Sequence, residues 1–237
     1  MLDFSQFEYL TFDCYGTLIN WEAGILGALR PILSAHGIEL PGIEPPDQKI
    51  LRLYGECEAE AEAGEFKIYR KILEGVVEAF GRRLGFSPSA AEVQSLPQSL
   101  QNWPPFPDTV DALRQLNARY KLAIISNVDD DLFAATAKLL QVPFDAIITA
   151  QQARSYKPSL NNFRLAQKRI GKPKEKILHV AQSLYHDVVP TRALGWKNVW
   201  VNRRKDQPGP GATILANIEP DLEVSSLQAL AELAAPR

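Results

Sequence analysis

The chain has 237 residues, a formal net charge of −2 and a sequence pI of about 6.0. This weak charge, with lysine and arginine dispersed among acids, argues against binding to nucleic acid or to an anionic membrane. Two cysteines, Cys14 and Cys57, are too few for a disulfide framework and lack metal-ligand spacing. Because we find neither a signal peptide nor an apolar run of the ~18 residues that a membrane span needs, we expect a cytoplasmic protein.

The first predicted element is a short buried strand, Tyr9–Asp13, whose apolar and β-branched residues run into a glycine turn. Residues 19–103 show helical patterns and no convincing strand. We expect helices at Glu22–Ala35, Asp47–Ala63, Glu65–Leu84 and Ser89–Gln101. The third has an apolar face of Phe66, Tyr69, Ile72, Leu73, Val76, Val77 and Phe80. Residues 19–103 are therefore predicted to form an all-helical cap domain.

The proline-rich segment Asn102–Asp108 cannot continue a helix and marks the return from this insert. After it, helices alternate with short apolar strands. The expected helices are Asp108–Ala118, Asp130–Leu140, Asn161–Gly171, Val188–Ala193 and a final Leu227–Ala235, with a loop at Pro208–Gly211. The expected strands are Lys121–Ser126, Ala146–Thr149, Ile177–Ala181 and Asn198–Asn202. This alternation predicts an α/β core domain, a doubly wound parallel sheet built by residues 1–18 and 104–237.

Polar residues follow four of the predicted strands, where a doubly wound sheet binds its ligand. They are Asp13, the pair Ser126 and Asn127, then Lys157, and finally Gln182, Ser183 and Asp187. Each has a simpler explanation taken alone, because Asp, Ser and Asn commonly cap helices or form turns, and a loop lysine is commonly solvated. The convergence of four strand ends predicts one site, with Asp13 as its nucleophile.

These motifs resemble the haloacid dehalogenase superfamily over essentially the whole chain. The segment FDCYGTL carries Asp13, IISN ends in Asn127, SYKP contains Lys157, and HVAQSLYHD ends in Asp187. The resemblance implies a Rossmann-like core with a helical cap inserted between the first and second motifs. It also implies that Asp13 attacks the substrate covalently.

Two residues depart from the magnesium-dependent phosphatases of this superfamily. Tyr15 replaces an aspartate that protonates the alkoxide leaving group, and tyrosine, with a pKa near ~10, is a poor acid at neutral pH. Gln182 replaces an aspartate that binds Mg²⁺, which prefers anionic oxygen. We therefore expect no metal and no cofactor, and attack on carbon; Mg²⁺ would be needed only by a phosphatase.

The pattern D-x-Y-G-T resembles the L-2-haloacid dehalogenase (type II) branch. This implies that Asp13 displaces a group, with halide expected, from the α-carbon of a short 2-substituted carboxylic acid. Water then hydrolyses the aspartyl ester and releases a 2-hydroxy acid. The same resemblance implies that Thr17 orients the Asp13 carboxylate and that Lys157 stabilises the charge on Asp13. It implies that Ser126 and Asn127 bind the substrate carboxylate or the nucleophile. Asp187 would position Lys157 and the hydrolytic water.

The chain also departs from the dehalogenase branch. Leu184 and Phe163 replace an asparagine and a tyrosine of that branch. The arginine with which its cap receives halide has no clean counterpart: Arg52 is the nearest candidate, and Lys49 and Tyr54 are alternatives. Further substrate contacts are expected from Tyr15, Ser183, Tyr185 and His186.

Three other functions remain open. The segments NWPPFPDTV, SYKP and SLYHD are similar to S-azetidine-2-carboxylate hydrolase, which opens a strained amino-acid ring by attack at carbon; Tyr185 or His186 would then protonate the ring nitrogen. The others are a Mg²⁺-dependent small-metabolite phosphatase and a non-catalytic binding protein. The expected partners are a small carboxylic acid and water, with no nucleic acid or membrane, and a homodimer is compatible with the resemblance.

Overall fold

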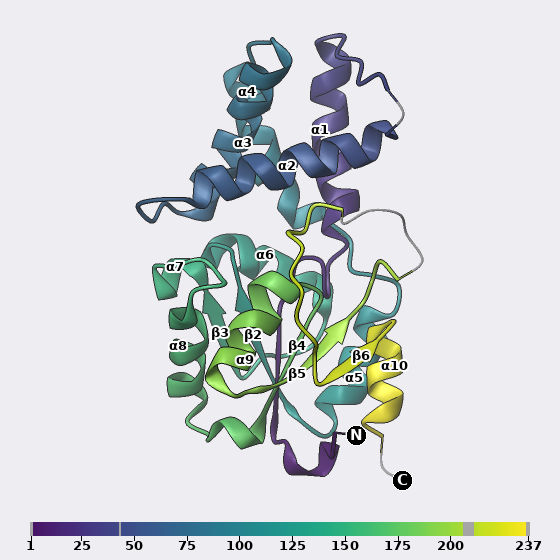
Figure 1. Ribbon diagram of the computed structural model, residues 1–237, viewed down its shortest axis with the longest axis vertical. Coiled ribbons are helices and arrows are strands. Elements are labelled where there is room, and N and C mark those ends of the chain that lie inside the picture. Colours follow the sequence, from purple (N-terminus) through teal and green to yellow (C-terminus); the bar gives the residue numbers. More distant parts are fainter. Residues whose placement is uncertain (1, 43, 206–210, 236–237) are drawn as a thin grey trace.

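Six parallel strands form one sheet in the order β3-β2-β1-β4-β5-β6 (Figure 1). The computed structural model describes residues 2–42, 44–205 and 211–235, so residues 208–210 of the expected loop lie outside the described residues. The strands are β1 (Tyr9–Phe12), β2 (Lys121–Ser126), β3 (Ala146–Thr149), β4 (Ile177–Ala181), β5 (Lys197–Val201) and β6 (Leu222–Val224). The predicted α/β class and parallel sheet are confirmed.

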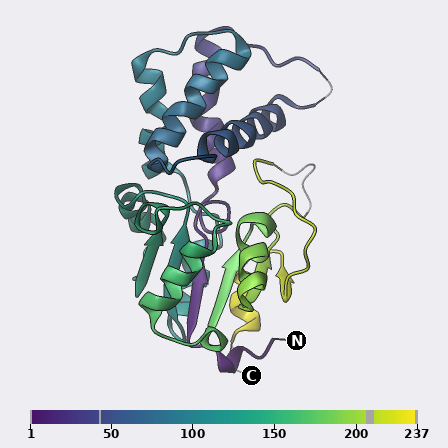
Figure 2. The same ribbon diagram turned by 60° about the vertical axis from the view of Figure 1, so that its left-hand side comes forward.

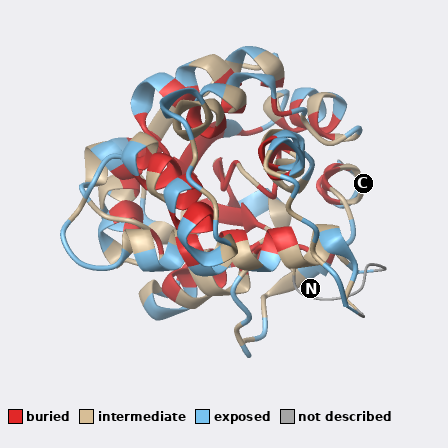
Figure 3. Cartoon of the chain, turned by 90° about the horizontal axis from the view of Figure 1, so that it is seen from above, coloured by how far each residue is buried: buried red, intermediate tan, exposed pale blue. Residues whose placement is uncertain are grey.

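The central strand β1 is buried along its whole length. Phe12 pairs with Ile124 of β2 on one side and with Val180 of β4 on the other. Successive residues point to opposite faces: Leu10 joins one apolar core cluster, whereas Tyr9 joins the second. Helices cover both faces, which explains why neither side of this strand is exposed to solvent (Figure 3).

Six helices belong to this sheet layer. They are α5 (Thr109–Asn117), α6 (Asp130–Leu140), α7 (Ala150–Ala153), α8 (Leu160–Ile170), α9 (Val189–Leu194) and α10 (Leu227–Leu233). Leu113 of α5 and Leu230 of α10 pack in the cluster that contains Leu10, and Phe163 of α8 packs in the cluster that contains Tyr9. The sequence pattern did not predict the edge strand β6, because it has only three residues and a single buried one, Val224.

Four further helices lie beyond the carboxyl ends of the strands (Figures 1 and 2). They are α1 (Trp21–Ala35), α2 (Pro46–Glu62), α3 (Tyr69–Leu84) and α4 (Ala90–Ser99), the last followed by the 3₁₀ turn η2 (Leu100–Asn102). All four fall within residues 19–103, the range of the expected cap, although the domain boundaries stay a prediction. In the described part of the chain, no helix combines the length and apolarity needed to cross a membrane.

Helix α3 begins at Tyr69 and not, as expected, at Glu65. The reason is a contact with a remote residue: the Asp129 carboxylate accepts hydrogen bonds from the backbone N–H groups of Tyr69 and Arg70, both at 2.8 Å. Phe66 therefore lies outside the helix. Asp129, and not the Ser126–Asn127 pair, is also the N-cap residue of α6.

We expect Asp129→Ala to lower the free energy of unfolding by about 1–2 kcal/mol, because two N–H groups at the start of α3 lose their acceptor. The matched control is Asp131→Ala. Asp131 also contacts α3, through Arg70, but its side chain is 67% exposed, and an exposed ion pair contributes at most about 1 kcal/mol. Urea unfolding measures both, and equal losses would contradict the capping role.

Candidate active site

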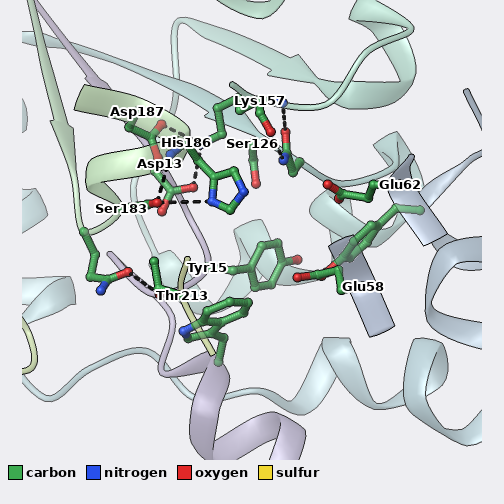
Figure 4. Close-up of a pocket in the computed structure, with 14 residues that line it drawn as sticks. Asp13, Tyr15, Glu58, Glu62, Ser126, Lys157, Ser183, His186, Asp187 and Thr213 are labelled. Atoms are coloured by element: carbon green, nitrogen blue, oxygen red, sulfur yellow. Dashed lines mark hydrogen bonds and ion pairs between the residues drawn. The ribbon is translucent and has the colours of Figure 1, made fainter. Parts of the chain in front are cut away.

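A pocket lies between the carboxyl end of the sheet and helices α1 to α3 (Figure 4). Its empty volume is about 500 Å³, counting the part open to solvent. The residues that line it are Asp13, Tyr15, Trp21, Glu58, Glu62, Tyr69, Ser126, Asn127, Lys157, Gln182, Ser183, His186, Asp187 and Thr213. This location agrees with the rule that open α/β sheets bind ligands beyond their strand ends.

The Lys157 ammonium occupies the floor of the pocket and is 2% exposed. It donates hydrogen bonds to Oδ1 of Asp13 at 2.8 Å, to Oδ1 of Asp187 at 2.7 Å and to the backbone oxygen of Ile125 at 3.0 Å. An ammonium group has three N–H donors. All of them are therefore committed, and they join the ends of three strands.

The charges of Lys157, Asp13 and Asp187 shift one another's pKa values. Burial alone would lower the pKa of Lys157, but the charges of Asp13 and Asp187 outweigh it and raise that pKa. Burial would raise the pKa of Asp187, yet Lys157 and His179 bring it below the ordinary aspartate range. The pKa of Asp13 is raised by its burial, which the charge of Lys157 only partly offsets. Lys157 and Asp187 thus form an ionised pair, and Asp13 is the aspartate of the two that is easier to protonate.

A tight turn fixes the second oxygen of Asp13. The Thr17 hydroxyl donates to Oδ2 of Asp13 at 2.6 Å and accepts a hydrogen bond from the backbone N–H of Gln182 at 2.8 Å. Gly16 allows this turn because its φ is +94° and an added Cβ would lie 3.3 Å from the Gln182 side-chain oxygen. The expected orientation of Asp13 by Thr17 is present in the geometry.

Behind Asp187 lies His179, a residue that the sequence analysis did not select. Its Nε2 lies 2.9 Å from Oδ1 of Asp187, and its Nδ1 lies 2.9 Å from the hydroxyl of Thr11. Because a carboxylate only accepts, Nε2 carries the proton and orients Asp187. The available signal was a histidine inside an apolar central strand, which must find partners when buried.

Ser126 and Asn127 have different positions. The Asn127 side chain accepts from the backbone N–H of Lys157 at 2.7 Å and donates to its backbone oxygen at 3.2 Å, so it holds the lysine loop. The Ser126 hydroxyl lines the pocket, is 1% exposed and has no hydrogen-bond partner among the described residues. A buried polar group without a partner is costly, so Ser126 is available to a ligand.

The cap side of the pocket carries two carboxyl groups that the sequence analysis also did not select. Glu58 and Glu62 lie one turn apart on α2, and both face the pocket. The hydroxyls of Tyr54 and Tyr69 donate to Glu58 at 2.8 and 2.5 Å. Burial raises the pKa of both glutamates, that of Glu62 well above its ordinary range. The spacing from Tyr54 to Glu62 in steps of four residues was the signal that these side chains share a face.

Two expected site residues lie elsewhere. Arg52 is on the exposed face of α2, where its guanidinium pairs with Glu44 at 3.2 Å and Glu56 at 3.0 Å, so its assignment as the leaving-group receiver is wrong. Tyr185 lines an adjoining cavity with Phe66 and not the main pocket.

The two alternatives to Arg52 as receiver of the leaving group, Lys49 and Tyr54, are bound to other groups of the protein. The Lys49 ammonium binds the backbone oxygens of Leu40 and Pro41, and Tyr54 is buried against Glu58.

Ser183 and His186 do line the pocket. The Ser183 hydroxyl lies 3.1 Å from Nδ1 of His186 and accepts from the His186 backbone N–H at 3.0 Å. Burial lowers the pKa of His186 to about 4, against the attraction of Asp187. The imidazole is therefore neutral at neutral pH and is a poor source of protons.

The donor atoms do not fit Mg²⁺, which prefers several free anionic oxygens. Both Asp13 oxygens and Oδ1 of Asp187 already accept hydrogen bonds. The side-chain oxygen of Gln182 accepts from Thr213 at 3.2 Å. In the described part of the chain, no group of three or more His, Cys, Asp or Glu residues is placed to hold a metal ion.

The fold, and the carboxylates that its strand ends bring together, define an α/β protein with a candidate active site beyond the carboxyl end of its sheet. A model of the haloacid dehalogenase-like hydrolase family matches residues 7–189. The chain therefore belongs to this family and is a hydrolase of the dehalogenase type. The expected membership is confirmed, while the similarity to S-azetidine-2-carboxylate hydrolase stays a prediction.

Curated relatives and solved structures extend this result. An (S)-2-haloacid dehalogenase of Pseudomonas fluorescens is 28% identical over 201 residues, covering 81% of this chain and 83% of the relative. Another, from Pseudomonas sp. (strain YL), is 27% identical over 228 residues, covering 94% of this chain and 93% of the relative. A structure of the Xanthobacter autotrophicus L-2-haloacid dehalogenase with chloropropionic acid covalently bound has a TM-score of 0.77 at 21% identity, covering 96% of this chain and 98% of that chain. A defluorinating L-2-haloacid dehalogenase has a TM-score of 0.80 at 21% identity, covering 96% and 95%. At these identities the structures support the fold.

We expect the His186 imidazole to titrate with a pKa of about 4, well below the ordinary 6.5, because its burial disfavours the cation. Its contribution to the free energy of unfolding is then complete above pH 6.5 and declines as pH falls towards 4. NMR titration measures this directly, since the chain has only three histidines and His186→Gln identifies the resonance. A midpoint near 6.5 would show that the imidazole is not desolvated as described.

Proposed function

We propose that the protein hydrolyses a bond at the α-carbon of a short 2-substituted carboxylic acid, without a metal, through an ester of Asp13. The observation that carries this proposal is the Asp13 carboxylate itself, held by Lys157 at 2.8 Å and by Thr17 at 2.6 Å at the floor of a small pocket. The names of the relatives support halide as one leaving group, because they are 2-haloacid dehalogenases.

In the first step an Asp13 oxygen attacks the α-carbon and the bond to the leaving group breaks. Thr17 and Lys157 hold the two carboxylate oxygens, so the nucleophile is aligned before the substrate arrives. The unpaired Ser126 hydroxyl provides a donor for the substrate carboxylate at the sheet side of the pocket.

In the second step water attacks the carbonyl carbon of the ester, which releases a 2-hydroxy acid and one proton and restores the Asp13 carboxylate. The Lys157 ammonium stabilises the negative charge that develops on this carbonyl oxygen. Oδ2 of Asp187 has no hydrogen-bond partner among the described residues, so it can accept a hydrogen bond from the attacking water. His179 orients Asp187 for this role.

The site supports a phosphatase less well. A phosphate monoester loses an alkoxide, which needs a proton donor. The Tyr15 hydroxyl is paired with Thr136 at 2.8 Å, and burial raises its pKa well above the ordinary tyrosine value. Tyr15 is therefore a poor proton donor for the alkoxide. The side-chain oxygen of Gln182, which is neutral and already accepts from Thr213, is a poor ligand for Mg²⁺.

We expect Asp13→Asn to lower turnover of 2-chloropropionate by at least about 1,000-fold, because the amide is not a nucleophile. In single turnover with ¹⁸O-water, the wild type should place ¹⁸O in Asp13, which mass spectrometry of the peptide detects. EDTA should leave the rate unchanged. Label in the product alone would contradict the ester, and release of p-nitrophenol from its phosphate that EDTA abolishes would favour a phosphatase.

The pH dependence follows from the same residue. Asp13 must be ionised to attack, and its burial raises its pKa above the ordinary aspartate value of 3.8. We therefore expect kcat/KM to fall on the acid side with a midpoint above 3.8 and to reach its plateau at higher pH. A profile that stays flat down to pH 3.8 would show that the pKa of Asp13 is not raised, or that Asp13 is not the nucleophile.

A further inference from the structure

The adjoining cavity, which Tyr185 lines, is continuous with the main pocket. Its empty volume is about 1070 Å³, against about 500 Å³ for the main pocket, both counting the part open to solvent. Four residues line both spaces, namely Glu58, Glu62, Lys157 and His186. An acid as small as 2-chloropropionate, placed against Asp13, would leave the adjoining cavity unfilled. The site therefore has room for a longer substrate.

The adjoining cavity offers apolar surface on which a hydrocarbon chain can pack. Its apolar lining residues come from the end of α2, from the segment that connects α2 to α3, and from two loops of the sheet layer. They are Ala59, Ala63, Phe66, Pro158, Ala212 and Ile214. Burial of methylene groups against such side chains is favourable, so this surface suits the chain of a longer acid.

Arg154 is the unpaired cation of this cavity. Among its described lining residues the lysine and arginine side chains are Lys157, whose three donors are already bound, and Arg154. The Arg154 guanidinium lies over the ring of Phe66, 5.5 Å from its centre, and has no hydrogen bond or ion pair to any described residue. Stacking on a ring leaves the N–H groups at the edge of the guanidinium plane free, and these match the two oxygens of a carboxylate.

The backbone of Arg154 has a conformation that favours glycine. Arg154 follows helix α7 with a φ of +50° and a ψ of 39°, in the left-handed region. Figure 1 shows α7 on the same side of the molecule as the connection between α2 and α3, which contains Phe66. An arginine in this conformation is strained, and such strain is concentrated at functional sites. The strain and the unused donors together indicate a ligand for the guanidinium.

We propose that Arg154 binds a second carboxylate at the far end of the substrate, so that the substrate is a 2-substituted dicarboxylic acid whose methylene chain lies in the adjoining cavity. This inference rests on the proposed function, because Asp13 attacks the same α-carbon and Ser126 receives the carboxylate next to it. The distant carboxylate takes no part in bond breaking. It determines which acid is bound and in which direction its chain runs.

The lining between the two cavities sets a minimum length for this chain. Glu58 and Glu62 line both spaces, and acidic side chains are poor partners for a carboxylate. Uncharged methylene groups must therefore pass them before the second carboxylate reaches Arg154. We expect 2-chloroadipate, with its longer chain, to be a better substrate than 2-chlorosuccinate.

The test compares two acids of the same chain length. 2-Chloroadipate and 2-chlorohexanoate have the same reacting carbon and the same number of carbons, and only the first has a terminal carboxylate. From chloride release, we expect kcat/KM of the wild type to be about tenfold or more higher for 2-chloroadipate, because the carboxylate gains charge-assisted hydrogen bonds. In Arg154→Gly this ratio should fall about tenfold, and in Arg154→Lys it should fall less, because the charge remains without the planar fork.

Two controls separate binding from backbone and charge effects. Gln141, also a non-glycine residue with positive φ, at +57°, lines neither cavity, so Gln141→Gly makes the same backbone change elsewhere. Arg164 is an exposed cation of α8 that lines neither cavity, so Arg164→Gln removes one positive charge. Both variants should leave the ratio unchanged. Glycine adopts positive φ without strain, so Arg154→Gly should fold, which thermal unfolding followed by circular dichroism verifies.

The possible results separate the two proposals. A wild-type preference for 2-chloroadipate below about threefold is no more than an exposed ion pair provides. That result, or an unchanged ratio in Arg154→Gly, would overturn the second carboxylate site, and ¹⁸O in Asp13 with 2-chloropropionate would leave the proposed function standing. Absence of chloride release from every acid and of ¹⁸O in Asp13 would overturn the proposed function itself.

Discussion

The Lys157 ammonium, held between Asp13 and Asp187, is the interaction on which the rest of this structure depends. Its acceptors come from the ends of three strands, at 2.7 to 3.0 Å, and it is almost completely buried. A buried cation is tolerated only when its charge and all its donors are matched. The ammonium therefore requires the parallel order of β2, β1 and β4 that brings those ends together, and Asn127 fixes its backbone from the same edge.

The two sides of the pocket have different constraints. On the sheet side, Asp13 and its partners are fixed by strand ends and by a chain of hydrogen bonds that runs through His179 to Thr11. On the cap side, the lining depends on how α2 is rotated and where α3 begins. Asp129 links the sides, because it lies at the start of α6 and caps α3. Helices that are anchored in this way can present different side chains to the pocket while Asp13 stays in place.

This separation explains how family membership and substrate can be independent. The family match and relatives at 27 to 28% identity establish what kind of hydrolase this is. The substrate side of the pocket is lined by side chains of α2, namely Glu58 and Glu62, which do not come from the strand ends. Function in such a fold depends on a few side chains at the site and not on the fold itself.

The sequence by itself determined the fold class, the order of the main elements except β6 and the short helix α7, and the group Asp13, Thr17, Lys157 and Asp187. These follow from local patterns, because a parallel sheet necessarily brings the polar residues after its strands to one edge. Only the tertiary structure decided that Arg52 faces solvent while Glu58 and Glu62 face the pocket, that His179 supports Asp187, and that α3 starts at Tyr69. The physical reason is that the rotation of a helix, and the partner of a buried polar group, are set by contacts with residues far away in the chain, which no local pattern records.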